Sequence, residues 1–185
     1  MLNVIPFVHE GLGNSSYLLQ VGEGEAALID PDRCVDRYLE AAGSHGWTIG
    51  SIFETHGHAD FVSGALEAAH VTGAPIYLPG ESQAEFSHSV LSLGLRTLIG
   101  GVTVEPIASP GHTPEHTSYV FRGDGATPVL FSGGSLIVGG ASRTDLISEQ
   151  MTEPLTRALH GTLMTAFSSL ADETMLCPTH GAGSF

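Results

Sequence analysis

The stretch Thr55-His56-Gly57-His58-Ala59-Asp60 follows the apolar pair Ile52-Phe53 and decides how the rest of the chain is interpreted. In an extended backbone, side chains at alternate positions project to the same side, so His56, His58 and Asp60 can converge on one point. Imidazole nitrogen binds zinc, iron, manganese and nickel, and a carboxylate oxygen widens that choice. The spacing favours a metal site, although a solvated histidine-rich loop has the same pattern.

Two later histidines supply the context that separates these alternatives. His112 lies in Ser109-Pro110-Gly111-His112-Thr113-Pro114, and His180 lies in Pro178-Thr179-His180-Gly181. Together with the first stretch, these segments make the chain resemble the metallo-β-lactamase superfamily, in particular its glyoxalase II and persulfide dioxygenase branch, in the form often fused to rhodanese domains. The residues that carry this resemblance are Gly13-Asn14-Ser15-Ser16-Tyr17-Leu18, His58-Ala59-Asp60-Phe61-Val62-Ser63-Gly64, Pro110-Gly111-His112-Thr113-Pro114-Glu115-His116, Arg143-Thr144-Asp145-Leu146 and His180-Gly181-Ala182-Gly183-Ser184.

The resemblance implies an α/β fold, the four-layer αββα metallo-β-lactamase sandwich. A chain of 185 residues is long enough for one such domain, so we expect residues 1–185 to form a single domain. In the rhodanese-fused proteins the chain continues past the segment that matches His180 to Ser184. We therefore expect either a domain truncated at its C-terminus or a naturally short relative. A rhodanese module is the partner that this form implies, and the oligomeric state is left open.

The composition limits the partners and the location of the protein. Twenty acidic residues stand against six arginines and no lysine, which gives a formal charge of −14 and disfavours nucleic acid, whose binding depends on Lys and Arg. No apolar run approaches membrane-spanning length, and the N-terminus lacks a signal-peptide pattern, so we expect no membrane contact and a cytoplasmic location. Cys34 and Cys177 are expected to be small buried hydrophobic residues.

The hydrophobic pattern predicts alternating strands and helices. Asp30 and Pro31 are expected to begin a first helix that ends near Gly43, and Thr152 is expected to cap the last helix. Residues 80–100 are predicted to be a loop with weak helical character. The predicted strands are 2–8, 16–21, 26–29, 49–54, 74–78, 102–107, 117–121, 128–131, 136–138 and 175–177, and a second helix is predicted over 65–71.

The resemblance also implies a ligand set. The first metal site of the two-metal relatives corresponds to His56, His58 and His112. The second keeps only Asp60 and His180, because Phe61 stands where the family has a further histidine. Gly134, in Ser132-Gly133-Gly134, replaces the aspartate that bridges the metals. We therefore expect one divalent metal ion, zinc or iron, and expect Gly134→Asp to raise the affinity for iron if the site is otherwise intact.

Three functions remain open from these residues. In the first, His56, His58 and His112 hold zinc, for hydrolysis of a small thioester-like substrate. Asp60 then acts as general base or orients the water, and His180 helps to hold the water or a substrate oxygen. In the second, Asp60 or His58 completes an iron site that oxidises a thiol persulfide. Both take a small thiol-derived substrate. In the third, the chain is a non-catalytic relative that binds metal weakly or not at all.

Neighbouring residues are assigned supporting roles. We expect His116 to support the ligands rather than to bind metal. We expect Arg143 and Asp145 to form a structural ion pair under the site rather than to touch substrate. The other histidines have no partner at ligand spacing and are expected on the surface or in the core; they are His9, His45, His70, His88 and His160.

Overall fold

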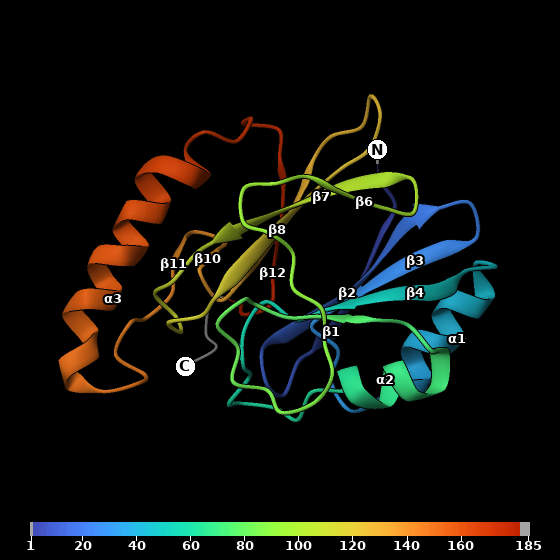
Figure 1. The fold of residues 1–185 in the computed structure, drawn as a ribbon, viewed down its shortest axis with the longest axis horizontal. Coiled ribbons are helices and arrows are strands. Elements are labelled where there is room, and N and C mark those ends of the chain that lie inside the picture. Colours follow the sequence, from blue (N-terminus) through green and yellow to red (C-terminus); the bar gives the residue numbers. More distant parts are fainter. Residues whose placement is uncertain (1, 182–185) are drawn as a thin grey trace.

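The computed structural model describes residues 2–181 and contains two five-stranded sheets that face each other, with helices on their outer sides (Figure 1). Three separate groups of buried side chains lie between successive layers. The four-layer αββα arrangement expected from the sequence is therefore confirmed.

The first sheet has the strand order β1 (Val4–His9), β2 (Asn14–Gly22), β3 (Glu25–Ile29), β4 (Thr48–Phe53) and β5 (Ile76–Tyr77). The first three strands are antiparallel, and β3, β4 and β5 are parallel because the helices α1 (Asp36–Ser44) and α2 (Ala65–Thr72) cross between them.

Neighbouring residues of these strands point to opposite faces, and both faces are covered. Ile52 packs against the two helices, whereas Phe53 packs between the sheets. Leu28 and Ile29 divide in the same way. This explains why the strands are nearly continuous apolar runs instead of alternating with polar residues.

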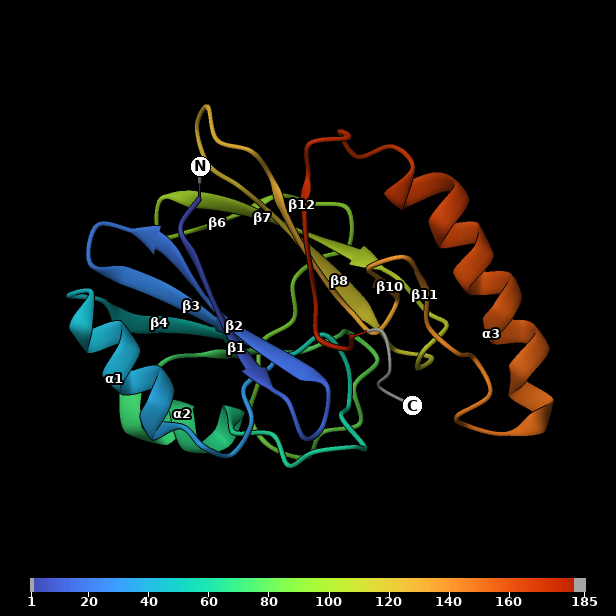
Figure 2. The same ribbon diagram turned by 180° about the vertical axis from the view of Figure 1, so that it is seen from behind.

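The second sheet has the order β12 (Met175–Pro178), β9 (Val129–Gly133), β8 (Thr117–Arg122), β7 (Val102–Ala108) and β6 (Thr97–Ile99). Its outer face carries α3 (Glu149–Thr162) and the π-helical turn Leu163–Phe167, on the side of the molecule away from α1 and α2 (Figure 2). A two-stranded hairpin, β10 (Leu136–Ile137) and β11 (Gly140–Ala141), lies between β9 and α3 in the chain. Phe53 contacts Phe121 edge-on at 5.3 Å and joins the two sheets.

The start of the first helix was predicted wrongly. α1 begins at Asp36, with Val35 before it, and not at Asp30-Pro31. Asp30 is fully buried and has a positive φ of 46°, because its carboxylate is held by groups from other strands instead of capping a helix. Cys34 is exposed, against expectation, while Cys177 is buried as predicted.

Two further predictions also need correction. The described segment 80–100 contains no helix, and Thr97–Ile99 instead forms β6, paired with β7. The last helix starts earlier than expected, because Ser148 caps it by accepting from the Met151 N–H at 3.3 Å. Thr152 lies inside the helix, where its hydroxyl donates to the Ser148 carbonyl.

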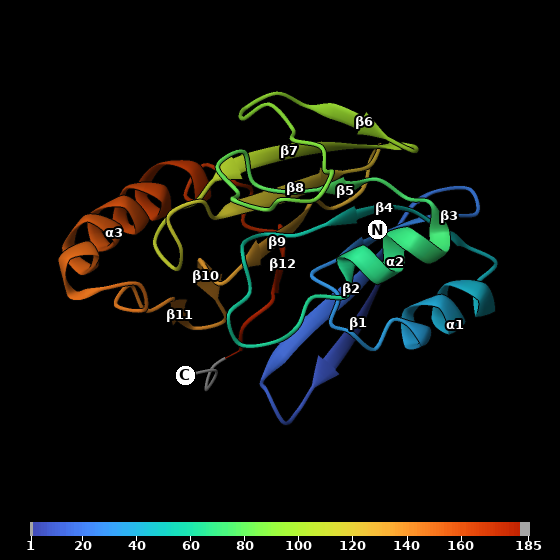
Figure 3. The ribbon, with the colours of Figure 1, turned by 60° about the horizontal axis from the view of Figure 1, so that its bottom comes forward.

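The two sheets meet in a way that brings several strand ends together (Figure 3). β3 and β4 are parallel, as are β9 and β12, and the polar segments of the expected site follow the ends of β4 and β12. The carboxyl ends of parallel strands are where ligand sites form in such sheets. Within residues 2–181, no helix has the length and apolar character needed to cross a membrane.

Candidate metal centre

The structure brings together all four histidines that the sequence singled out as ligands. His56 and His58 follow β4, His112 follows β7, and His180 follows β12. The centroid of the His56 ring lies 4.2 Å from that of His58, 4.7 Å from that of His112 and 5.3 Å from that of His180. Segments separated by more than a hundred residues thus meet at one point.

Among the residues that the structure describes, three groups of possible ligand atoms lie close together; one is Asp30, Glu54 and His58, and the other two overlap. His56, His112 and His180 each offer one atom within 4.8 Å of the others, and His58, Asp60 and His180 form a second set by the same measure. We had expected His58 to complete a set with His56 and His112. The structure groups His180 with these two residues instead, and it makes His180 common to both sets.

The hydrogen bonds of Thr55 fix the tautomer of His56. The Thr55 hydroxyl donates its only proton to Asp30 Oδ2 at 2.8 Å, so it can only accept from His56 Nδ1, which lies 2.9 Å away. His56 therefore carries its proton on Nδ1, and its Nε2 presents a lone pair.

The same reasoning applies to His180. Asn14 donates from Nδ2 to Asp60 Oδ2 at 2.6 Å, so its amide oxygen faces His180 Nδ1 at 3.1 Å and accepts from it. His180 thus also carries its proton on Nδ1. This hydrogen-bond chain holds Asp60 beside the ring, with Asp60 Oδ2 lying 3.7 Å from His180 Nδ1.

The two unprotonated nitrogens face each other. His56 Nε2 lies 3.2 Å from His180 Nε2. Burial lowers the pKa of both rings, that of His56 to well below its usual value, so neither ring gains a proton readily. Two lone pairs this close are favourable only when a cation is between them. Nitrogens about 2.0–2.1 Å from a tetrahedral zinc are roughly 3.3 Å apart, so the observed spacing fits a bound divalent metal.

His112, the third residue of this set, also has a neutral ring. Burial, followed by the neighbouring His180, lowers the pKa of His112 to about 4, so its ring is neutral at pH 7. Its buried Nδ1 has no hydrogen-bond partner within the described residues. Neutral imidazoles with available lone pairs are the form that binds metal.

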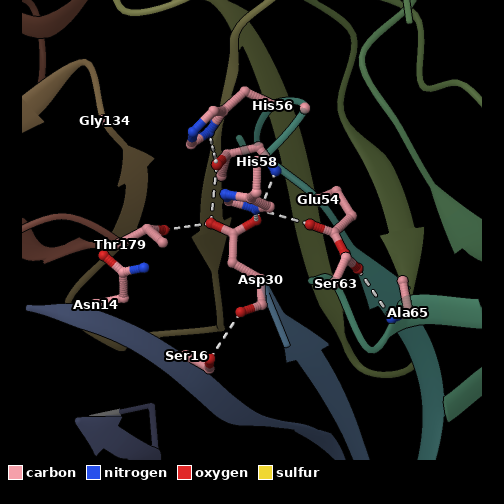
Figure 4. Close-up of polar contacts among 12 residues, drawn as sticks. Asn14, Ser16, Asp30, Glu54, His56, His58, Ser63, Ala65, Gly134 and Thr179 are labelled. Carbon is pink, nitrogen blue, oxygen red and sulfur yellow. Dashed lines mark hydrogen bonds and ion pairs between the residues drawn. The ribbon is translucent and has the colours of Figure 1, made fainter. Parts of the chain in front are cut away.

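His58 has a different environment, because its Nε2 lies between two buried carboxylates (Figure 4). Nε2 is 2.8 Å from Glu54 Oε2 and 3.2 Å from Asp30 Oδ1. Burial alone would lower the pKa of His58, but the charge of Asp30 and its hydrogen bonds to both carboxylates raise the pKa to about 10. Its Nδ1 is buried and has no partner among residues 2–181. Nε2 is thus committed to the carboxylates, and a ring with this raised pKa carries a proton on Nδ1 as well at pH 7, so His58 is an ion-pair partner and offers no lone pair.

The sequence did not identify Asp30 and Glu54 as site residues. Asp30 accepts from the Thr55 N–H at 2.7 Å and from the hydroxyls of Thr55 and Thr179, so it links the ends of β3, β4 and β12. These bonds and His58 keep the pKa of Asp30 low despite complete burial, whereas burial raises the pKa of Glu54. The available signal was an acid directly after each of two apolar strands, in Ile29-Asp30 and Phe53-Glu54.

Two residues that depart from the family pattern also have defined surroundings. The Phe61 ring stacks on His58, with ring centroids 4.3 Å apart and planes inclined by 29°. Gly134 lies against His112, and a Cβ atom added there would stand 2.6 Å from His112 Cγ. The expectation that Gly134→Asp restores a ligand in an unchanged site is therefore not supported, because the His112 ring occupies that space.

His116 has the supporting role that was expected. Its Nε2 accepts from the Gly134 N–H at 3.0 Å, and its Nδ1 lies 2.8 Å from the Ser109 hydroxyl. The ring stacks on His56 with centroids 4.9 Å apart. Both nitrogens are therefore occupied, and burial lowers the pKa of His116 to about 3. Arg143 and Asp145 form the predicted ion pair through two hydrogen bonds, but the pair lies on the surface and not under the site.

Comparison with known proteins identifies the family of the chain. The family model of the metallo-beta-lactamase superfamily matches residues 9–180. A hydroxyacylglutathione hydrolase of Salmonella arizonae is 30% identical over 180 residues, which are 97% of this chain and 65% of that protein. The chain thus spans about two thirds of the length of this relative.

Two solved structures are also similar. A metallo-beta-lactamase from Staphylococcus aureus superposes with a TM-score of 0.88 and 31% identity, over 99% of this chain and 57% of that one. ETHE1 from Myxococcus xanthus superposes with a TM-score of 0.83 and 26% identity, over 99% and 77% of the two chains. The chain therefore belongs to the metallo-beta-lactamase superfamily, and its described residues include histidines that can hold a divalent metal.

Proposed function

We propose that this protein is a metal-dependent hydrolase of a small thioester-like substrate. The observation that carries the proposal is the pair of facing Nε2 atoms of His56 and His180, 3.2 Å apart, with both Nδ1 protons already committed to other acceptors. Two lone pairs at this distance repel each other unless a cation lies between them. The similarity to hydroxyacylglutathione hydrolases suggests the reaction class.

One metal ion would be held by His56, His112 and His180. A divalent metal on three nitrogen ligands lowers the pKa of bound water to about 7 and polarises a substrate carbonyl. The rings of His56 and His180 donate from Nδ1 to the Thr55 hydroxyl and the Asn14 amide oxygen, and these hydrogen bonds keep the rings in place. Acceptors of this kind on the second ring nitrogen orient metal-binding imidazoles.

Asp60 is the proposed general base. Its side chain is 41% exposed, and the Asn14 amide holds one of its oxygens, so it is both reachable and oriented. A carboxylate in this position can accept a proton from water and pass it to a leaving thiolate. Because His180 directs Nε2 toward His56, we assign it to holding the metal and leave proton transfer to Asp60.

A cavity of about 170 Å³ lies beside His56 and His58 and limits the size of the substrate group that can enter there. A cavity of this volume suits a short acyl group. Most of its walls are apolar, and they include Ala65, Leu66, Leu78, Pro79, Ala84 and Phe86.

The second candidate function is oxidation of a thiol persulfide on iron, and it is favoured by the similarity to ETHE1. The same three histidines would hold the iron, with Asp60 as the nearby carboxylate. The expected cytoplasmic location, the rhodanese module and the small thiol-derived substrate remain predictions that accompany either function.

Metal analysis and turnover on freshly purified protein test the proposal. We expect about one zinc per chain and release of free thiol from small acyl thioesters, measured with a thiol-reactive dye. His56→Ala should abolish the release, whereas His70→Ala, an exposed histidine of α2, should not. Iron with oxygen consumption on a persulfide would support the second candidate. Protein that holds no metal and turns over neither substrate would refute both.

A further inference from the structure

The short connection Gly133-Gly134 passes directly beneath the imidazoles of the site. A Cβ atom at Gly134 would stand 2.6 Å from Cγ and 2.9 Å from Nε2 of His112, closer than real Cβ contacts. Its backbone is not in the left-handed region, so a side chain at position 134 would meet no backbone strain. Gly133 differs, since its φ of +55° favours glycine for the backbone alone. The obstacle at Gly134 is the His112 ring.

The same glycine also supports His56. Its N–H donates to His116 Nε2, and the His116 ring stacks on His56. The ring of His112 contacts His56 edge-on, with ring centroids 4.7 Å apart, and its centroid also lies 4.7 Å from that of His180. Gly134 therefore contacts one ring that belongs to the three-nitrogen set and another that holds a member of that set.

We infer that Gly134 is a positioning residue, whose missing side chain lets His112 join His56 and His180 in a metal set made of three neutral nitrogens. This inference deepens the proposed function and rests on it for the presence of a metal. It assigns the set to His56, His112 and His180, with no carboxylate from the loop after β9. A side chain at position 134 should therefore expel His112 from the set instead of adding to it.

The test compares Gly134→Ala with Gly43→Ala, a helix position where an added Cβ meets nothing within 4 Å. Zn²⁺ affinity is measured by competition with a chromophoric chelator, and Co²⁺ absorption reports the ligand geometry. We expect Gly134→Ala to weaken Zn²⁺ binding by roughly 10–100-fold, the usual effect of disturbing residues that orient ligands. Gly43→Ala should bind like the wild type. Unchanged Zn²⁺ affinity in Gly134→Ala would overturn the inference.

A double-mutant cycle shows whether the effect passes through His112. In metal-free protein, Gly134→Ala should lower the urea midpoint in the wild-type background and leave it unchanged in the His112→Ala background, where no ring blocks the Cβ. Equal losses in both backgrounds would contradict the inference. The cycle also covers a poorly folding Gly134→Ala, because the double variant should then recover its folding.

Gly134→Asp provides the opposing test. If the carboxylate completed the site, this variant would bind Fe²⁺ and Zn²⁺ more tightly than the wild type, and the inference would be wrong. We expect both metals to bind more weakly. None of these readouts uses turnover, so a wild type that binds Zn²⁺ but hydrolyses no thioester would refute the proposed function and leave the inference standing.

Discussion

His56 and His58 lie two residues apart, yet they occupy regions with opposite electrostatics. His56 is surrounded by the rings of His112, His116 and His180, and burial together with these neighbours lowers its pKa. His58 lies between Asp30 and Glu54, which raise its pKa to about 10. The motif therefore supplies a neutral ligand at one position and a charged structural residue at the next.

The comparison shows how one short loop can both bind a metal and be held firmly to the sheet. The carboxylate pair fixes the loop to the ends of β3 and β4 through His58, and the neutral region leaves lone pairs for a cation. A buried charge is tolerated only when it is paired, and a metal ligand functions only when it is deprotonated. These two requirements cannot be met by the same nitrogen, and here they are divided between two residues.

The largest effect on stability is expected from a substitution that breaks the ion pairs of His58. Asp30→Asn removes the charge that faces His58 and weakens the acceptor for three other donors. Breaking a buried pair by changing one partner costs about 3–5 kcal/mol of unfolding free energy. Urea unfolding of metal-free protein at pH 7 measures the loss, and the exposed Asp124→Asn serves as the control. Similar midpoints for both variants would show that the pair contributes little.

In the neutral region around His56, a substitution should mainly weaken metal binding. His56→Ala is expected to weaken Zn²⁺ binding by more than roughly 100-fold, because even residues that only orient ligands contribute 10–100-fold. His58→Gln should mainly reduce the stability of the metal-free protein, since it leaves Asp30 and Glu54 without their cation. Isothermal titration with Zn²⁺ and urea unfolding separate the two responses. If both variants lost the same metal affinity and the same stability, the division of roles would be wrong.

The pH dependence of stability should show both regions in the metal-free protein. The pKa values of His112 and His116 are lowered to about 4 and about 3, so the unfolded chain binds more protons below pH 6.5. Their contribution to stability is therefore lost as the pH falls from about 6.5 toward 4. The raised pKa of His58 acts in the opposite direction: its contribution is complete below about 6.5 and is lost as the pH rises through 10.

Urea midpoints at pH 5, 7 and 9.5 measure these two changes. His58→Gln should remove the alkaline loss that is due to His58 and keep the acid loss. A variant with the same alkaline loss as the wild type would show that His58 is not the group responsible.

The smallest effect is expected at the surface pair. Asp145→Asn removes the partner of Arg143, but both side chains are about half exposed, and such pairs contribute little to stability. Neither the urea midpoint nor the Zn²⁺ affinity should change measurably. A clear loss of metal affinity would instead connect this pair to one of the two histidine regions.

The sequence predicted the positions of most strands because they are covered on both faces and therefore appear as apolar runs. The four-layer arrangement was expected from the resemblance of the sequence motifs to the metallo-β-lactamase superfamily. One of the prediction errors lies where a side chain found a partner far away in the chain. Asp30 has the local pattern of a helix cap, but it is bonded to Thr55 and Thr179 instead. Thr97–Ile99 has no strong strand pattern of its own and becomes a strand by pairing with β7.

The amino-acid sequence by itself determined which side chains could bind a metal, because ligand chemistry and alternate spacing are local properties of His56, His58 and Asp60. Only the tertiary structure decided how those groups are shared. Orientation and protonation depend on partners contributed by distant segments: Asn14 sets the tautomer of His180, Asp30 holds His58 and takes the Thr55 proton, and Gly134 leaves room for His112. Such contacts form when the two sheets come together, so no local pattern could have specified them.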